Sequence, residues 1–516
     1  MRVFRAAIFA ALLLFPAGLR AEDVTLTSRD GSVEISGNLL GFDGEFYRVE
    51  TEFGVLTVDG SSVDCDGPGC PTLGQFVAEL TISGARSVGS VVMPALIEGF
   101  AGREGYSLGR EELAGVGFRF RLYEKDSQRE AARVTLRLTD SDEGFADLIS
   151  GESDMVLAAR EATPAEQDMA RDAGIGDLRS SRQFRVIARD ALVPVVAPTN
   201  PVDEIALSAL ARALNGEIAR WGELGGEPAP ITPHLIDPKD DLARVFAGRF
   251  FADSGAIPKG AAVHQTMRGL TEAVTDDPFG LGLTTLSAAG SAKRLRLSGD
   301  CPAKLEATRA SVMAGDYPLT VPLFLYLPGR VLPKIARDFL AYLRTTSAQM
   351  VIRRSGLVSE PFEEISLDQQ GQRLANALLV ADDENGLEEL KRMARAFSSK
   401  ARIGLTFRFL GGSTELDAPS RANVEVLASA LGSGQFDGHR LHFFGFSDGV
   451  GDAAVNLRLS LRRANAVRRA VILAAEAGSA WKFNAVADGF GEALPIACDD
   501  TEWGRQLNRR VEVWID

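Results

Sequence analysis

The segment "GFSDGVGDAAVNLRLSLRRANAV", residues 445–467, places an acidic and a basic side chain where both could meet one ligand. Asp448 lies in a turn, and Arg463 follows on a helix whose apolar stripe it flanks. A carboxylate can pair with an ammonium group, and a guanidinium can grip a carboxylate through two parallel hydrogen bonds, so the pair suits a zwitterion. Taken alone, a turn aspartate and a solvated helix face are the simpler explanation. The apolar stripe consists of Leu457, Leu461, Ala464, Val467 and Val471.

The elements around this pair predict a C-terminal α/β domain at residues 403–516. Strands are expected near "IGLTFRF", "RLHFFGF", "KFNAVADGF" and "RRVEVWID", and the last of these alternates with a period of two. Helices are expected around residues 418–432 and 453–475. Residues 366–402 read as helical and charged, and they form a linker or the first helix of this domain.

Several motifs follow one another in this domain: "SDGVG", "NLRLSLRRANAV", "GFGEALPIACDD" and "GRQLNRRVEVW". In this order they resemble the OmpA-like peptidoglycan-binding domain family, an α/β sandwich. The resemblance implies that Asp448 and Arg463 bind the amino and carboxylate groups of diaminopimelate in the peptidoglycan stem peptide. It also implies that Asn456 and Arg510 shape and support the site. The family usually has His-Thr before the aspartate, where this chain has Phe446-Ser447, so one edge of the site is altered.

Residues 73–365 alternate strands with helical segments, a pattern that predicts an α/β domain with a mostly parallel sheet. The segment "FRVIARDALVPVVAP" is expected to form two of its strands. Further segments follow in order: "LNGEIARWGELGG", "DDPFGLGLTTLS", "GDYPLTVPLFLYLPG" and "FLAYLRTTSAQMVIRRSGLV". Over residues 76–360 the chain thereby resembles the phosphate-binding (PstS-like) family of periplasmic solute-binding proteins. The resemblance implies two lobes that close over a ligand cleft.

The same resemblance implies that the cleft includes Arg86, Ser87 and Arg160. The family's first phosphate loop corresponds to Gly84-Ala85-Arg86-Ser87, which keeps part of the hydroxyl set. The family's "SGTR" helix start falls in "DPKDDLARVF", where Asp240 and Asp241 replace hydroxyl and glycine positions. Two desolvated acids would repel phosphate by an amount on the order of several kcal/mol, which Arg160 could offset. We therefore expect a retained cleft with weakened phosphate specificity.

The N-terminal residues indicate export and a small β module. In residues 1–21, two arginines precede an apolar run that small residues follow, an order typical of a cleaved signal peptide. Residues 22–72 alternate polar and apolar positions between Asp-Gly turns, a pattern that predicts hairpins. In an exported chain, "CDGPGC" favours a disulfide between Cys65 and Cys70. The sequence leaves open whether Cys301 and Cys498 pair, and the cysteine spacing disfavours a zinc site.

The composition narrows the class of function. The chain has 516 residues, which predicts two to four domains, and its formal net charge of -14 disfavours nucleic acid as a partner. Its 4 histidines lie in no familiar nucleophile or metal spacing, and His234 and His264 fall in separate segments of the central domain. No Walker loop or dinucleotide fingerprint occurs. These features predict a protein that is not an enzyme and has no cofactor.

Together these patterns predict a multidomain α/β protein of the periplasm, associated with the cell wall or the outer membrane. It is expected to bind peptidoglycan non-covalently through the C-terminal domain. Its central domain is expected to take a small anion or to dock an envelope protein. The alternative is a receptor for phosphate or another oxyanion that is tethered to the cell wall.

Overall fold

The structure is a computed structural model that describes ten stretches of the chain: residues 23–71, 76–113, 117–250, 257–299, 301, 303–359, 362–380, 384–410, 413–476 and 484–516. The expected signal peptide at residues 1–21 lies outside them. Contacts divide the chain into a small unit up to Glu79, to which Pro333–Ala336 are assigned, and a large unit that holds all other residues to Asp516. Among the described residues, no helix combines the length and the apolar character that crossing a bilayer requires.

The small unit is an antiparallel sheet in the order β4-β3-β2-β1-β5. Alternate side chains of β1 and β3 are buried and form a core of Val24, Leu26, Tyr47 and Val49. The disulfide expected from "CDGPGC" is present and joins Cys65 of β5 to Cys70. The strands are β1 (Val24–Ser28), β2 (Glu34–Phe42), β3 (Phe46–Thr51), β4 (Gly54–Asp59) and β5 (Val63–Asp66).

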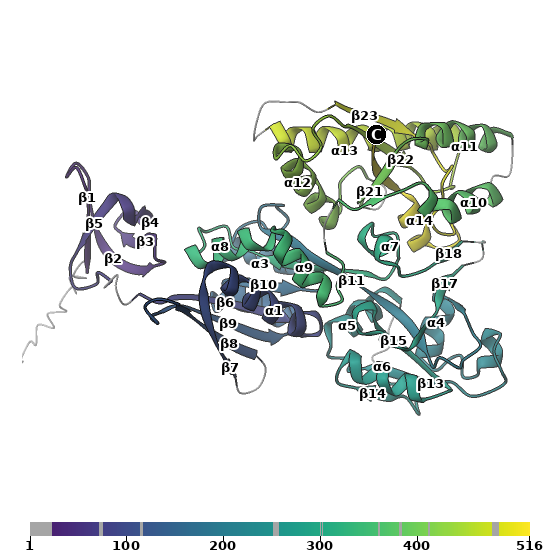
Figure 1. The fold of residues 1–516 in the computed structure, drawn as a ribbon, viewed down its shortest axis with the longest axis horizontal. Helices are drawn as coiled ribbons and strands as arrows, with labels where there is room; N and C mark the ends of the chain where they lie inside the picture. Colours follow the sequence, from purple (N-terminus) through teal and green to yellow (C-terminus); the bar gives the residue numbers. More distant parts are fainter. Residues whose placement is uncertain are drawn as a thin grey trace, which may run out of the picture. The chain divides into compact units, whose positions relative to one another are not determined.

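The central domain has two lobes on one mixed sheet in the order β14-β13-β15-β11-β19-β10-β6-β9-β8-β7 (Figure 1). The first lobe contains β6 (Ala78–Ala85), α1 (Arg86–Glu104), β7 (Tyr106–Glu112), β8 (Gly117–Glu124), β9 (Glu130–Thr139), α2 (Ser141–Ser150), β10 (Met155–Ala158), α3 (Pro164–Asp172), β19 (Thr320–Tyr326), α8 (Lys334–Leu343) and α9 (Thr346–Arg354). The second contains β12 (Glu204–Ala206), α4 (Leu207–Leu214), β13 (Thr232–Ile236), α5 (Asp241–Phe250), β14 (Ala262–His264), α6 (Met267–Asp276) and β15 (Gly280–Thr285). Short elements connect it back: β16 (Lys293–Arg294), β17 (Arg296–Ser298), β18 (Lys304–Leu305) and α7 (Arg309–Met313).

One strand, β11 (Phe184–Val196), crosses between the lobes, where the sequence predicts two strands. Its first part pairs with β19, and from Leu192 onward it pairs with β15. The partner changes while the strand continues, so the prediction of a break was wrong.

The prediction of a mostly parallel sheet was also wrong. The pairs β6–β10, β13–β14 and β13–β15 are parallel. However, β7, β8 and β9 form antiparallel hairpins, and the crossing strand β11 is antiparallel to both β15 and β19. Hairpins join neighbouring strands without the crossover helix that a parallel pair needs.

The C-terminal domain is a sheet in the order β20-β21-β24-β22-β23, covered on both faces. Side chains alternate across β24, so Val511 and Val513 pack with residues of α12 and α13, while Trp514 packs with residues of α10 and α11. The helices of residues 366–402 therefore share a core with this domain. The elements are β20 (Glu364–Ile365), α10 (Gly371–Val380), α11 (Glu384–Phe397), β21 (Ala401–Arg408), α12 (Ala418–Gly432), β22 (Arg440–Phe446), α13 (Ala453–Glu476), β23 (Asn484–Gly489), α14 (Glu502–Asn508) and β24 (Arg510–Ile515).

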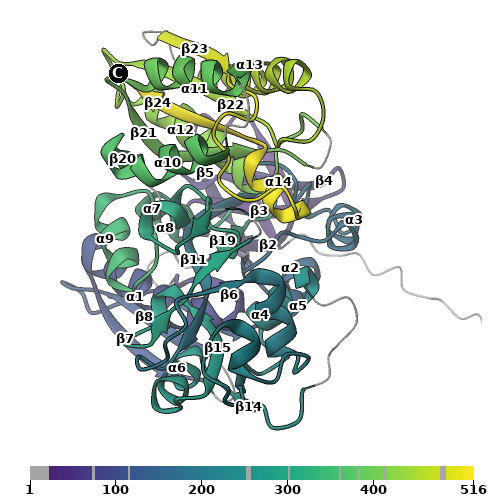
Figure 2. The same cartoon turned by 90° about the vertical axis from the view of Figure 1, so that its right-hand side faces the viewer.

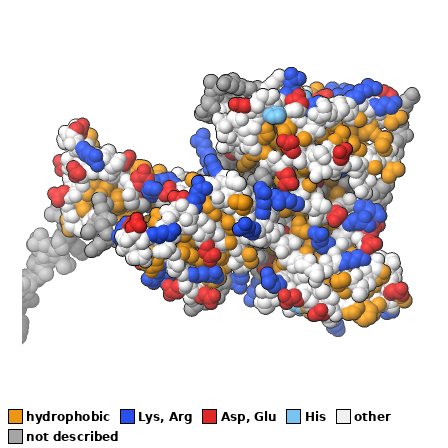
Figure 3. Space-filling view, in the orientation of Figure 1, with side chains coloured by type: hydrophobic (Ala, Val, Ile, Leu, Met, Phe, Trp, Pro, Cys, Tyr) orange, Lys and Arg blue, Asp and Glu red, His pale blue; other side chains and the backbone are white. Residues whose placement is uncertain are grey.

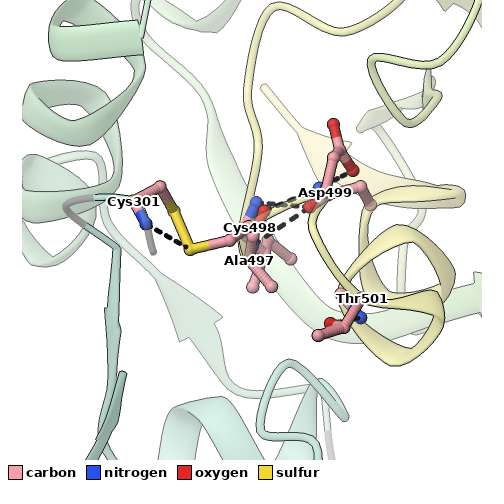
Figure 4. Close-up of a disulfide and its surroundings, with 8 residues drawn as sticks. Cys301, Ala497, Cys498, Asp499 and Thr501 are labelled. Atoms are coloured by element: carbon pink, nitrogen blue, oxygen red, sulfur yellow. Dashed lines mark hydrogen bonds between the residues drawn. A yellow bond between two sulfur atoms is a disulfide. The ribbon is translucent and has the colours of Figure 1, made fainter. Parts of the chain in front are cut away.

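Within the large unit, the central and C-terminal domains are joined covalently and by buried charges. Cys301 and Cys498 form a disulfide across 197 residues, just before α14 begins (Figure 4). Asp316 of the central domain accepts hydrogen bonds from Arg402 at 2.6 and 3.2 Å and from Arg408 at 3.1 Å. Helix α12 contacts β11, and α7 contacts β21. Figure 2 shows the C-terminal domain above the end of the central domain where α7 lies.

Candidate functional site

Asp448 lies on the loop between β22 and α13, as predicted, and it already has a cationic partner. Arg509 Nη1 donates to its Oδ2 at 2.7 Å, and both side chains are mostly buried. Arg509 also donates to Glu502 at the start of α14. Burial opposes the charge of Arg509, but these two hydrogen bonds outweigh it and raise its pKa. The site is therefore an ion-pair chain that runs from the loop to α14.

Arg463 faces inward from α13 beside this ion pair. Its exposed fraction is only 2%, and Nε and Nη1 have no hydrogen-bond partner among the described residues. The guanidinium carbon lies 5.1 Å from the ring centroid of Phe409. Burial lowers the pKa of Arg463, as does the charge of Arg509, whereas Asp448 opposes this effect. A buried cation with unused donors is expensive, so this side chain is suited to an anionic ligand.

The buried face of α13 is more polar than the sequence predicts. Ser460 and Arg463 are buried together with Ala464, whereas Leu461 is 39% exposed. Asn456 is also buried and donates to Glu492 Oε2 at 3.1 Å and to the Val450 carbonyl at 3.3 Å. Asn456 therefore ties the loop that carries Asp448 to its surroundings. Its expected role in shaping a ligand site stays a prediction.

The departure at Phe446-Ser447 has two structural consequences. Phe446 is fully buried and packs against Phe490, so it belongs to the core under α10 and α11. Ser447 is buried as well, and its hydroxyl has no hydrogen-bond partner among the described residues. The altered edge thus consists of a buried phenyl ring at Phe446 and a single small hydroxyl at Ser447 next to Asp448.

Arg510 lies behind the site. Its side chain is fully buried, donates to Glu512 Oε1 at 2.8 Å and to the Leu494 carbonyl at 2.9 Å, and stacks on Phe446 at 4.2 Å. The sequence motifs point to Arg510, whereas its neighbour Arg509 is the residue that reaches Asp448. The period of two in β24 could have indicated this, because it places Arg510 on the same face as Trp514 and leaves Arg509 outside the strand.

At the cleft predicted for the central domain, polar groups donate hydrogen bonds to the chain's own carboxylates. Ser87 donates to Asp240 Oδ2 at 2.6 Å. The backbone N–H and the hydroxyl of Ser141, at the start of α2, both donate to Asp241 Oδ2 at 2.8 Å. A helix N-terminus and a hydroxyl are the groups that would hold an oxyanion, and here each has a carboxylate partner. Burial raises the pKa of Asp241.

The two arginines predicted for the cleft are also engaged. Arg160 donates to both oxygens of Glu166 at 2.7 and 2.8 Å and also to Asp142. Arg86 is exposed and donates to the Leu138 carbonyl at 3.3 Å. The structure therefore brings Ser87 and the two aspartates together, whereas Arg86 and Arg160 make other contacts.

The structure also joins two histidines that the sequence places in separate segments. His234 on β13 lies 3.0 Å from His264 on the neighbouring β14, and its other ring nitrogen lies 3.1 Å from Asp277. Burial lowers the pKa of His264, and His234 lowers it further. No group of three or more potential metal-binding side chains is found among the described residues. The two histidines make a polar contact between adjacent strands, and Asp277 joins them from the turn between α6 and β15.

Comparison with known proteins assigns both large domains. Residues 122–346 match the PBP superfamily domain, and residues 408–509 match the OmpA family. The chain is 35% identical over 122 residues to outer membrane porin F of Pseudomonas aeruginosa, covering 23% of this chain and 33% of the porin. It is 26% identical over 187 residues to the phosphate-binding protein PstS of Bacillus subtilis, covering 36% of this chain and 60% of that protein.

The chain thus spans about a third of the length of the porin it matches. Among solved structures, an ABC-type phosphate transport receptor from Vibrio cholerae aligns with 18% identity and a TM-score of 0.42, covering 55% of this chain and all of that one. The chain therefore joins a PBP superfamily domain at residues 122–346 to an OmpA family domain at residues 408–509.

Proposed function

We propose that this protein is an exported, non-enzymatic component of the cell envelope that binds peptidoglycan non-covalently. Asp448 receives the ammonium group of diaminopimelate, and Arg463 receives its carboxylate. The observation that carries this proposal is Arg463, a nearly fully buried guanidinium with two unpartnered nitrogens beside a carboxylate.

Energetics favour a ligand at this position. Leaving a buried donor unsatisfied costs about 1–3 kcal/mol, and more when the donor is charged. A carboxylate that accepts two parallel hydrogen bonds from Arg463 would remove that cost. At the other end, Arg509 pairs with Asp448 and orients its carboxylate. The ligand's ammonium group would share Asp448 with Arg509, whose second partner, Glu502, keeps that guanidinium partly neutralised.

The test is retention of the mature full-length protein on purified peptidoglycan sacculi. Asp448→Ala and Arg463→Ala should each weaken binding by about 30-fold or more, because truncating one partner of a buried charged contact costs about 2 kcal/mol or more. Arg463→Lys keeps the charge but loses the paired hydrogen bonds, so its retention should be intermediate.

Arg462→Ala is the matched control, because Arg462 is the exposed neighbour of Arg463 on the same helix. It removes the same charge from the protein and should leave retention unchanged. Equal loss in the Arg462 and Arg463 variants would reduce the effect to general electrostatics. Unchanged retention in all the variants would refute the diaminopimelate site.

The second candidate, a receptor for phosphate or another oxyanion, has less support. The hydroxyl of Ser87 and the N-terminus of α2 already bind Asp240 and Asp241. Phosphate would have to displace two carboxylates and then lie beside them, at a cost on the order of several kcal/mol. We expect no heat when phosphate is titrated into the protein at millimolar concentration. Saturable heat would instead favour the receptor.

Location in the periplasm, at the cell wall or the outer membrane, belongs to the same proposal. The N-terminal signal pattern supports export, and the disulfides suit an oxidising compartment. The likeness to outer membrane porin F adds support for the envelope. Fractionation of cells that express the protein would test it, and recovery in the cytoplasm would contradict it.

A further inference from the structure

A cavity of about 650 Å³ lies in the large unit, lined by both the central and the C-terminal domains. The central domain contributes residues of β11, of β19 and of the loop before it. The C-terminal domain contributes residues of β21, α12 and α14. Arg160, predicted for the cleft of the central domain, lines this cavity, whereas Ser87, Ser141, Asp240 and Asp241 do not. Its volume falls in the range of small-molecule sites, about 300–1,000 Å³.

The wall of this cavity combines cations, carboxylates, small polar groups and apolar surfaces. Its carboxylates are Glu161, Asp417 and Glu502, and Arg160 lies in the wall as well. Arg189 from β11 is 4% exposed and donates to Asn423 Oδ1 at 3.1 Å. Arg408 from β21 donates to Asp316 Oδ1 at 3.1 Å, and its Nε has no hydrogen-bond partner among the described residues. Further polar groups come from Thr320, Thr406 and Ser420, and apolar surfaces come from Tyr317, Phe324 and Trp503.

Arg408 belongs to a group of ion pairs in which arginines outnumber acids. It belongs to a cluster of four arginines and two acids with mostly buried side chains: Arg373, Arg402, Arg408, Arg510, Asp316 and Glu512. Asp316 accepts from two of the arginines, and Glu512 pairs with the other two and also with Arg402. Burial lowers the pKa of Arg408 and Arg402 lowers it further, while Asp316 and Asp417 oppose this. Within these ion pairs the four arginines outnumber the two acids. Arg408 brings this excess positive charge to the cavity, where Asp417 offsets part of it.

We propose that this interdomain cavity is a second ligand site, which binds a small organic carboxylate with an apolar body. The carboxylate meets Arg189 and Arg408 and offsets the excess positive charge. The apolar body packs against Phe324 and Trp503. Because the walls come from both domains, each domain alone has only half of the site. A bare inorganic anion would meet the arginines but leave the apolar walls uncovered.

Trp503 and Glu502 place this site next to the proposed peptidoglycan site. Both residues line the cavity from α14, and Glu502 is the second partner of the Arg509 that holds Asp448. Cys498 and Cys301 fix the segment before α14 to the central domain (Figure 4). The two sites are nevertheless separate, since neither Asp448 nor Arg463 lines the cavity.

The test is calorimetric titration of the mature full-length protein with 4-phenylbutyrate and N-acetyl-leucine. We expect at least one of them to bind with a dissociation constant below about 10 mM. The alcohol 4-phenylbutanol and inorganic phosphate should bind at least about tenfold more weakly, because the alcohol has no carboxylate and phosphate has no apolar body. No binding by either carboxylate at about 10 mM, or equal binding of alcohol and carboxylate, would overturn the proposal.

Variants locate the site. Arg408→Gln removes one of the excess charges and should weaken carboxylate binding about tenfold or more. Trp503→Ala removes part of the apolar wall and should also weaken carboxylate binding. Because it leaves the charge cluster intact, it can replace Arg408→Gln as the test if that variant does not fold. Arg179→Gln removes an exposed arginine that bridges the same two domains outside the cavity, and it should bind like the wild type. Asp448→Ala should retain the carboxylate, which separates this proposal from peptidoglycan binding. Unchanged affinity in the Arg408 and Trp503 variants would refute the assignment.

Discussion

The disulfide between Cys301 and Cys498 should be a large single contribution to the stability of the large unit. It closes a loop of 197 residues in the unfolded chain. In the chain-entropy description, a loop of that length lowers the entropy of the unfolded state by an amount worth about 5 kcal/mol at 25 °C. The disulfide between Cys65 and Cys70 spans only 5 residues and should contribute about 2 kcal/mol. The double variant Cys301→Ala/Cys498→Ala therefore removes far more stabilisation than the double variant of the short disulfide.

Urea unfolding followed by tryptophan fluorescence can measure this difference. All four tryptophans, at positions 221, 481, 503 and 514, follow Leu80, so their emission reports on the large unit. The interdomain variant should lower the unfolding midpoint strongly, whereas Cys65→Ala/Cys70→Ala should leave this signal nearly unchanged. If both double variants shift the midpoint equally, loop length does not set the stabilisation and the reasoning fails.

Two further predictions concern buried charges. Burial raises the pKa of Asp190 to about 6, so the folded state holds that proton more tightly than the unfolded chain, whose value is near 3.8. Its contribution to stability should therefore fall by about 2 kcal/mol as pH rises from about 4 to about 6. The stability difference between the wild type and Asp190→Asn, measured in urea across that range, should change by this amount, and a constant difference would contradict the prediction. Asp316→Ala leaves Arg402 and Arg408 without their shared acid and should cost about 3–5 kcal/mol in the same assay. Glu415→Ala breaks an exposed pair between the same domains and should cost less than about 1 kcal/mol, so equal losses would argue against buried charge as the cause.

The local pattern of the sequence was enough to predict elements that have two distinct faces. The period of two in "RRVEVWID" corresponds to β24, whose alternate side chains enter two different cores. The helix expected around residues 418–432 begins after Asp417, whose side chain accepts a hydrogen bond from the Ser420 N–H, with a proline in the first turn. Such signals lie within a few residues of each other, which is why they can be read without tertiary information.

Strand direction and strand continuity could not be predicted in the same way. Strand β11 is buried along nearly its whole length, so its residues contain no mark of the point where its partner changes from β19 to β15. The pairing of Cys301 with Cys498 stayed open for a similar reason, since 197 residues separate them. In both cases the deciding contact is made by a segment distant in the chain.

The candidate site also combines features that local sequence predicts with features that depend on distant contacts. Helical spacing placed Arg463 beside the apolar stripe, and the structure buries it there. The hydrogen bond from Arg509 to Asp448 joins residues 61 positions apart, and the choice between two adjacent arginines depends on which one β24 takes into the sheet. The aspartates at positions 240 and 241 were recognised as unfavourable for phosphate. Their role as partners of Ser87 and Ser141 needed the two lobes to be in place.

The two proposed sites meet at α14, and this has a thermodynamic consequence. Glu502 lines the interdomain cavity and also pairs with Arg509, which in turn holds Asp448. An ammonium group bound at Asp448 would compete with Arg509 and strengthen its pairing with Glu502. Glu502 would then present less negative charge to a carboxylate in the cavity, so each ligand should favour the other. Linkage requires the effect to be reciprocal, and a typical coupling is about 5-fold or more. Titrating 4-phenylbutyrate with and without free diaminopimelate would measure it, and Glu502→Gln should abolish the difference. If the dissociation constant for 4-phenylbutyrate in the wild-type protein is the same with and without diaminopimelate, the ion-pair chain does not couple the two sites.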